Sequence, residues 1–187
     1  MPTVFTHPAL PLALGLGLGP QVISPRLLLA GVVTSMLPDL DVVAFPLGVP
    51  YGSAFGHRGF THSLALALGV AVIAGCCHRA LRTTFTRGFL FILVATASHG
   101  ALDAFTNGGL GIAFLWPFSS ERYFAPYRVI EVSPIGISWL LSSRSLSVLG
   151  SELVWVWAPC VGLRLALAVI TRRRSTRRGG ESRSRSD

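Results

Sequence analysis

The residues of this sequence that could perform chemistry are histidines and aspartates, and they gather in four short clusters beside apolar segments. The clusters are Thr6-His7-Pro8, Pro38-Asp39-Leu40-Asp41, His57-Arg58-Gly59-Phe60-Thr61-His62-Ser63 and Ser98-His99-Gly100-Ala101-Leu102-Asp103. The chain is 51% hydrophobic and only 13% charged. Ionisable groups are costly to place near lipid, so their recurrence beside apolar segments indicates a functional site. Imidazole and carboxylate are also ligands that zinc and manganese bind.

The sharpest local signal is the pair His99 and Asp103. Residues four apart on a helix share one face, with their Cβ atoms about 5–6 Å apart. The two side chains can therefore bind one metal ion together, or the carboxylate can orient the imidazole. The alternative is a hydrogen-bonded pair that satisfies itself inside a helix bundle.

The second and third clusters have spacings that also allow ligand pairs. Asp39 and Asp41 are two residues apart, and in an extended segment such side chains point to the same side. A cation between them would relieve their repulsion, but a hydrophilic turn after a membrane segment explains the pair equally well. His57 and His62 lie on either side of a glycine turn, so a loop can direct both toward one centre. Arg58 is placed to hold an anion such as phosphate, or to anchor the loop to lipid headgroups.

Together, these positions form a set of seven candidate metal ligands. They are His7, Asp39, Asp41, His57, His62, His99 and Asp103. Seven nitrogen and oxygen donors exceed one tetrahedral site, so we expect one or two divalent ions, zinc or alternatively manganese. A metal-activated water would be the nucleophile of a hydrolysis, with Asp41 or Asp103 as general base and Arg58 on the substrate.

The elements that must position these residues are five apolar segments. They span residues 8–19, 27–37, 64–77, 88–105 and 146–171. At about 1.5 Å per residue, the last two are long enough to cross a hydrocarbon core of about 30 Å, whereas the first two are short. With a mean hydropathy of +0.59, the sequence predicts an all-α, polytopic transmembrane bundle over residues 1–171.

The basic residues predict the orientation of this bundle. All sixteen are arginines; three of them (Arg79, Arg82 and Arg87) lie between the third and fourth segments, and seven follow the fifth. The positive-inside rule places both groups in the cytoplasm. We therefore expect the N-terminus outside, the C-terminus inside, and all four clusters near the outer face. His78, among the inner arginines, is expected to have no role.

Two further segments have open interpretations. Residues 172–187 contain arginine, serine and glycine without an apolar residue, so we expect a disordered cytoplasmic tail. Nucleic-acid binding by these arginines is the less favoured alternative. The stretch of about forty residues between the fourth and fifth segments is rich in Trp, Phe and Tyr, which suits the headgroup level of a membrane. It is expected to pack at the interface, or alternatively to cover the site as a lid.

The order and spacing of the clusters resemble the YdjM/YbcI-like family of inner-membrane proteins. The resemblance extends over about residues 5–120 and includes two further motifs, Ala104-Phe105-Thr106-Asn107-Gly108-Gly109 and Trp116-Pro117-Phe118-Ser119. It implies a membrane-bound, metal-dependent hydrolase, with His7 as the family's early histidine. Because Arg58 and a metal centre both favour phosphate, we expect the substrate to be a membrane lipid or another phosphoester. The alternative is a non-enzymatic membrane protein that uses the cluster for metal binding, transport or structure.

Overall fold

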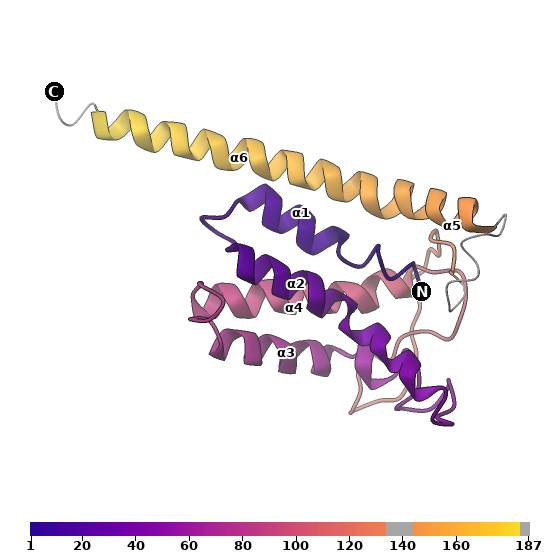
Figure 1. Ribbon diagram of the computed structural model, residues 1–187. Helices are drawn as coiled ribbons and strands as arrows, with labels where there is room; N and C mark the ends of the chain where they lie inside the picture. The colour runs from indigo at the N-terminus through magenta and orange to yellow at the C-terminus, as the bar shows by residue number, and fades with distance from the viewer. Residues whose placement is uncertain (134–143, 184–187) are drawn as a thin grey trace.

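The computed structural model describes residues 1–133 and 144–183, and their regular structure is helical (Figure 1). The elements are α1 (Ala9–Leu18), α2 (Pro25–Met36), the 3₁₀ helices η1 (Leu37–Ala44) and η2 (Phe60–His62), α3 (Leu64–Cys76), α4 (Phe85–Ala104), α5 (Arg144–Glu152), the π-helical segment η4 (Leu153–Trp157) and α6 (Ala158–Arg183). Within these residues, β-pairing is limited to two isolated bridges. The prediction of an all-α bundle is confirmed.

Three helical runs of the described residues are long and apolar enough to cross a membrane. They are Pro25–Ala44, Phe85–Ala104 and Arg144–Arg173, whereas α1 and α3 are shorter apolar helices. The second predicted segment is longer than the sequence indicates, because η1 continues the helical backbone directly from α2. The start of α2 follows ordinary rules: the Ser24 hydroxyl accepts a hydrogen bond from the backbone N–H of Leu27, and Pro25 occupies the first turn.

The apolar core lies where α4 packs between α2 and α3 (Figure 1). Its buried centre contains Ile23, Leu27, Ala71, Phe91 and Ile92. The close approach of α2 and α4 requires a glycine, because a Cβ atom on Gly31 would lie 2.4 Å from Phe91 Cε1. This core is apolar and lies away from the four polar clusters, so it can stabilise the bundle independently of them.

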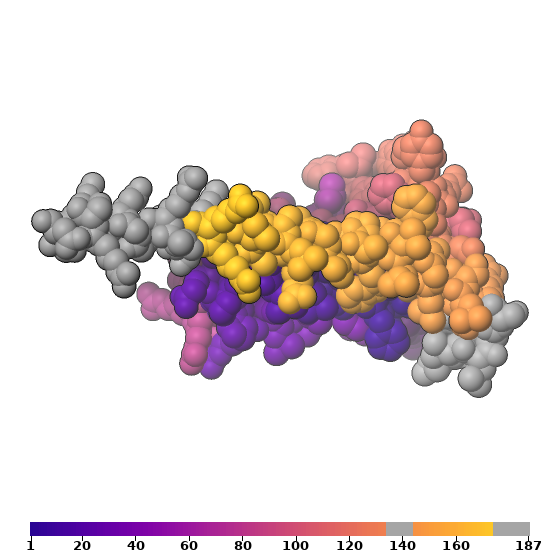
Figure 2. All heavy atoms as spheres, turned by 90° about the horizontal axis from the view of Figure 1, so that it is seen from above, coloured from indigo at the N-terminus to yellow at the C-terminus, as the bar shows by residue number. Residues whose placement is uncertain are grey.

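The last helix lies against α1 and covers the N-terminal half of the chain (Figures 1 and 2). Its contact with α1 is also close, since a Cβ atom on Gly17 would lie 3.0 Å from the carbonyl oxygen of Arg164. Only 6% of the apolar window in Arg144–Arg173 is buried inside the protein. A helix so apolar and so exposed has the surface expected of a lipid-facing span.

The helical backbone of α6 continues to Arg183, into the segment where the sequence predicts a disordered tail. Arginine has a high helix propensity, so a helix already formed by the apolar span can extend through an arginine-rich segment. Residues 184–187 of that predicted tail lie outside the described residues.

Candidate metal centre

All seven candidate ligands lie at one end of the bundle, and all of them are buried. His7 lies just before α1, and Asp39 and Asp41 lie in η1. His57 lies in the loop before η2, His62 is the last residue of η2, and His99 and Asp103 lie in the last turns of α4. Consecutive helices alternate in direction, so these chain positions meet although they are up to 96 residues apart in sequence. The structure thus brings the predicted set together. His78 lies at the opposite end, where its Nδ1 is 3.0 Å from the carbonyl oxygen of Gly75.

Four of the seven side chains converge on a common point, and we call them the inner group. Asp39, His62, His99 and Asp103 each offer one ligand atom, and these atoms all lie within 4.8 Å of one another. His99 Nε2 lies 3.0 Å from His62 Nε2 and 3.3 Å from Asp39 Oδ1. His62 Nε2 lies 3.3 Å from Asp103 Oδ2. Ligands on a tetrahedral zinc ion with bonds of about 2.0–2.1 Å would be about 3.3 Å apart. The spacing therefore fits one metal ion.

Several polar atoms of this centre have no hydrogen bond within the described part of the protein. Both carboxylate oxygens of Asp39 and of Asp103 are buried without a hydrogen-bond partner, and so are both ring nitrogens of His7. Buried polar atoms are nearly always hydrogen-bonded, and a buried carboxylate without a partner is especially costly. A divalent cation would satisfy these atoms together. The oxygen and nitrogen donors, without cysteine, suit zinc or manganese.

The two histidines nearest the centre have a defined surrounding. His99 Nδ1 lies 2.7 Å from the carbonyl oxygen of Ser35, which can only accept a hydrogen bond, so this nitrogen bears the proton. His99 Nε2 then directs its lone pair at the centre, as a metal ligand requires. The ring of His7 stacks on His99 with centroids 3.6 Å apart, and His7 Nε2 lies 3.5 Å from Asp39 Oδ2. Burial lowers the pKa of His7 to about 3, which keeps the ring neutral and able to bind a metal ion.

A second, outer group shares His62 with the inner group and adds Asp41 and His57. His57 Nδ1 lies 2.6 Å from Asp41 Oδ1, and His62 Nδ1 lies 3.4 Å from Asp41 Oδ2. The Thr61 hydroxyl donates to the same Oδ2 atom over 2.6 Å. Asp41 is therefore already hydrogen-bonded, unlike Asp39. Its carboxylate is placed to receive ring N–H protons and to orient both imidazoles.

The expectation that Asp39 and Asp41 point to the same side of an extended segment is wrong. Both residues lie in the 3₁₀ helix η1, where successive side chains turn by about 120°. Residues two apart therefore point in different directions: Asp39 reaches His7 and His99, whereas Asp41 reaches His57. The two carboxylates meet only at His62, on opposite nitrogens of its ring. Pro38 does not end the helical backbone, because proline is tolerated in the first turn of the new helix.

Arg58 is fully buried, and its guanidinium contacts the protein itself. Its Nε atom lies 3.3 Å from Asp103 Oδ2, and its terminal nitrogens donate to the Gly108 carbonyl over 2.9 Å and to the Thr106 hydroxyl over 3.0 Å. Its backbone has a φ of 63°, a conformation that costs a residue with a side chain about 1–3 kcal/mol. Such strain persists only where the surroundings enforce it. The arrangement places Arg58 beside the inner group as a partner of Asp103.

The segment that follows α4 packs directly over the loop with His57 and Arg58. The backbone N–H of Ala113 donates to the Arg58 carbonyl over 3.2 Å, and Arg122 donates to the His57 carbonyl over 3.1 Å. This segment therefore packs against the loop that carries His57 and Arg58, and both the interfacial and the lid expectation for it stay predictions. Neither Arg122 nor Ser35, which contributes only a backbone carbonyl, was identified from the sequence. Ser63, directly after His62, is the N-cap of α3, and its hydroxyl accepts a hydrogen bond from the backbone N–H of Leu66.

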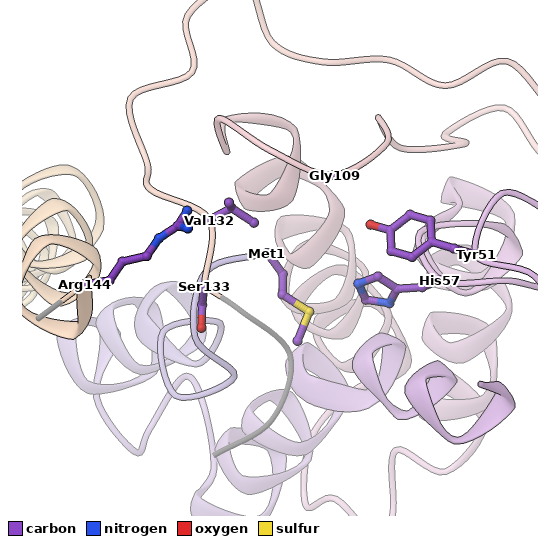
Figure 3. A pocket seen from close by; sticks show the side chains of 7 residues that line it. All are labelled: Met1, Tyr51, His57, Gly109, Val132, Ser133 and Arg144. Carbon is purple, nitrogen blue, oxygen red and sulfur yellow. The ribbon is translucent and has the colours of Figure 1, made fainter. Parts of the chain in front are cut away.

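A cavity of about 270 Å³ borders the outer group at His57 (Figure 3). Its lining residues are Met1, Tyr51, His57, Gly109, Val132, Ser133 and Arg144. Figure 3 shows the His57 ring on one side of this space and the Arg144 side chain on the other. Among the described residues, the lining includes a cation and a phenol but no carboxylate, so this part of the cavity suits an anionic group.

Comparison with known proteins places the chain among inner membrane proteins. The model of one family, described as YdjM inner membrane protein, matches residues 1–175. The chain is 51% identical over 160 residues to the inner membrane protein YbcI of Escherichia coli (strain K12), covering 85% of this chain and 92% of that protein. No solved structure matches significantly. Residues 1–175, which the family model matches, include all seven candidate ligands.

Proposed function

The chain belongs to the YdjM inner membrane protein family, and we propose that its inner group binds one divalent metal ion and uses it to hydrolyse a phosphoester at the membrane. Zinc is the proposed ion and manganese the alternative. The main support is the set of unpartnered, buried carboxylate and imidazole atoms on Asp39, Asp103 and His7. A fold that leaves so many buried polar atoms without hydrogen bonds needs a cation to offset the cost.

Asp39, His62, His99 and Asp103 would hold the ion, which would supply Lewis acidity for activating water and polarising a phosphoryl group. The side chains around it have separate tasks. His99 and His62 bind through Nε2, since the opposite nitrogens face the Ser35 carbonyl and Asp41. Arg58 holds the Asp103 carboxylate in place through the ion pair of its Nε atom with Oδ2. The two carboxylates expected to act as general base thus have different roles in this proposal: Asp103 would be a ligand, and Asp41 orients histidines.

His57 is the proposed proton acceptor and donor. Its Nδ1–H donates to Asp41, which fixes the tautomer and leaves the Nε2 lone pair for proton transfer. An imidazole oriented by a buried carboxylate is a recurrent arrangement for general acid–base catalysis. His57 also lines the cavity, so a substrate there would meet it directly.

The substrate class follows from the cavity and its surroundings. A space of about 270 Å³ accommodates a phosphate-sized headgroup with few additional atoms, and Arg144 provides the positive charge. Large apolar side chains remain exposed on α5 and η4, including Leu146, Leu153 and Trp155. A lipid phosphoester would place its headgroup in the cavity while its chains stay in the surrounding bilayer.

The metal site is tested by elemental analysis of detergent-solubilised protein produced with added zinc or manganese. Wild type should contain about one ion per chain, and His62→Ala and His99→Ala should lose it. The matched control is His78→Ala, a histidine at the other end of the bundle, which should retain the metal. Absence of metal from wild type after supplementation would refute the site. Two ions per chain would assign the outer group as a second site.

The hydrolysis is tested separately, with a soluble phosphodiester and with phospholipid vesicles. Turnover should require the metal, and His57→Gln should abolish it while the bound metal stays. Stoichiometric metal without turnover of any ester would instead favour the second candidate, a metal that holds the helix ends together. The near-complete burial of the ligands favours that reading, because it limits access of a substrate to the ion.

A further inference from the structure

A buried glutamate in the last membrane run has no role in the proposed reaction. Glu152 is the final residue of α5, directly before the π-helical segment η4, and only 2% of its surface is exposed. A carboxylate within an apolar span is costly and usually functional. We infer that Glu152 is a positioning residue, which fixes the N-terminal segment so that His7 stays against the metal centre. This inference rests on the proposed metal site.

The carboxylate of Glu152 accepts hydrogen bonds from Thr3 and Thr6, which lie just before His7 in the chain. Its Oε1 atom accepts a hydrogen bond from the backbone N–H of Thr3. Its Oε2 atom accepts from the Thr3 hydroxyl over 2.8 Å and from the Thr6 hydroxyl over 2.7 Å. Three donors on one carboxylate define its position closely, because a charged acceptor strengthens each bond. Thr6 is the residue directly before His7.

The π-helical segment explains why this helix can make such contacts. The Trp157 indole N–H also donates to the Thr6 hydroxyl, over 3.3 Å. In an α-helix, two residues five positions apart differ in direction by about 140°, so Glu152 and Trp157 would diverge. In a π-helix, with i→i+5 hydrogen bonds, they lie nearly above one another. The segment Leu153–Trp157 thus directs both side chains at Thr6.

The segment is fixed on the other side of His7 as well. Val156 of η4 packs in a buried cluster with Ala9 and Ile130. His7 therefore lies between two residues that the same helical segment immobilises. Since neither ring nitrogen of His7 has a hydrogen bond of its own, its stacking on His99 depends on these backbone anchors. Glu152 acts on the centre only through this segment.

Glutamate suits this position better than glutamine would. All three of its partners are donors, and a carboxylate offers only acceptors. In Glu152→Gln, the amide oxygen can still accept from the Thr3 N–H, but the NH₂ group would face the two hydroxyls, which would have to turn and accept instead of donate. The charge that strengthens all three bonds is also lost, which loosens the segment. The variant keeps the size of the side chain. A matched control is Glu131→Gln, since Glu131 accepts its hydrogen bond from Ser147 of α5 rather than from Thr3 or Thr6.

The test is a double-mutant cycle on full-length protein with cobalt(II) as the probe. Cobalt affinity and the visible absorption of the bound ion report on the ligands around it. We expect Glu152→Gln to weaken cobalt binding about 10-fold, the lower end for residues that orient a ligand, and to change the spectrum in the same direction as His7→Ala. In the His7→Ala background, Glu152→Gln should have no further effect. Thr6→Val should show a smaller version of the change, and Thr6→Ser should restore wild-type behaviour.

The possible failures are distinguishable. If wild type binds no cobalt, the proposed metal site fails and this inference with it. If wild type binds cobalt and Glu152→Gln binds it with the same affinity and spectrum, only the positioning role is refuted. Additive effects of Glu152→Gln and His7→Ala would also refute it, because they would show that Glu152 acts independently of His7. Should Glu152→Gln not fold, the Thr6→Val and Thr6→Ser pair makes the same comparison.

Discussion

Replacement of Arg58 by methionine is expected to destabilise the metal-free protein strongly. Methionine has a similar length but no charge, so Asp103 would lose its only ion pair with an arginine among the described residues. Both side chains of the pair are fully buried. Removing one partner of a buried ion pair costs about 3–5 kcal/mol, because the remaining charge is left uncompensated. In a chain of this length, that corresponds to a fall of about 6–20 °C in the melting temperature.

The same variant should respond more strongly to metal than wild type does. An ion in the inner group would neutralise Asp103 in place of the guanidinium, so added zinc should recover part of the lost stability. The assay is thermal unfolding in detergent micelles, with and without zinc. Arg26→Met is the matched control: Arg26 is exposed and donates only to the Ala80 carbonyl, so its loss should change stability by less than about 0.5 kcal/mol.

The reasoning about Arg58 has a clear contrary outcome. If its guanidinium contacted the substrate phosphate, as one sequence-based interpretation holds, Arg58→Met would lower kcat/KM and leave the melting temperature equal to that of Arg26→Met. That result would refute the positioning role derived from its burial and its carbonyl partners.

Three further predictions concern other parts of the molecule. The pKa of His7 is 6.5 in the unfolded chain and about 3 in the fold, so between these pH values the unfolded state binds one more proton than the folded state. The metal-free protein should therefore lose stability as the pH falls through this window, and in His7→Gln the melting temperature should depend less on pH. Arg144→Gln should raise KM for an anionic phosphodiester with little change for a neutral carboxylic ester and none in metal content, and equal KM changes for both substrates would contradict the anion subsite. Gly31→Ala should lower the free energy of unfolding by about 1–3 kcal/mol, because its new methyl group would clash with Phe91. The control Gly69→Ala, whose methyl group would meet no atom within 4 Å, should be neutral or slightly stabilising, and equal melting temperatures of the two variants would contradict the packing argument.

The ligand set was predictable from the sequence because polar residues are rare in it. In a chain so apolar, His99 and Asp103 stand out at helical spacing, and the structure places both in the last turns of α4. The five apolar segments likewise correspond to helices, because hydrophobic length is a strong signal for membrane spans. Orientation across the membrane, with the site near the outer face, stays a prediction from the arginines.

What the sequence did not reveal depends on tertiary contacts. Local patterns cannot show that η1 continues the helical backbone of α2 and that the Asp39 and Asp41 side chains therefore point in different directions. Arg58 looks like any loop arginine until the segment after α4 is seen to fold its carbonyl groups around the guanidinium. Glu152 gives no signal either, because its partners Thr3 and Thr6 lie about 150 residues away in sequence.

The origin of the ligands in four separate helix ends has a consequence for how the bundle responds to chelation. An ion bound there would act as a cross-link among these helix ends, while the rest of the bundle is held by its own apolar core around Leu27 and Phe91. Removal of the ion would leave the carboxylates of Asp39 and Asp103 close together, with Arg58 as the arginine that offsets the charge of Asp103. Amide hydrogen exchange should then accelerate in the turns around His62 and His99 and stay slow at the core, so that one end of the bundle opens while the other remains closed.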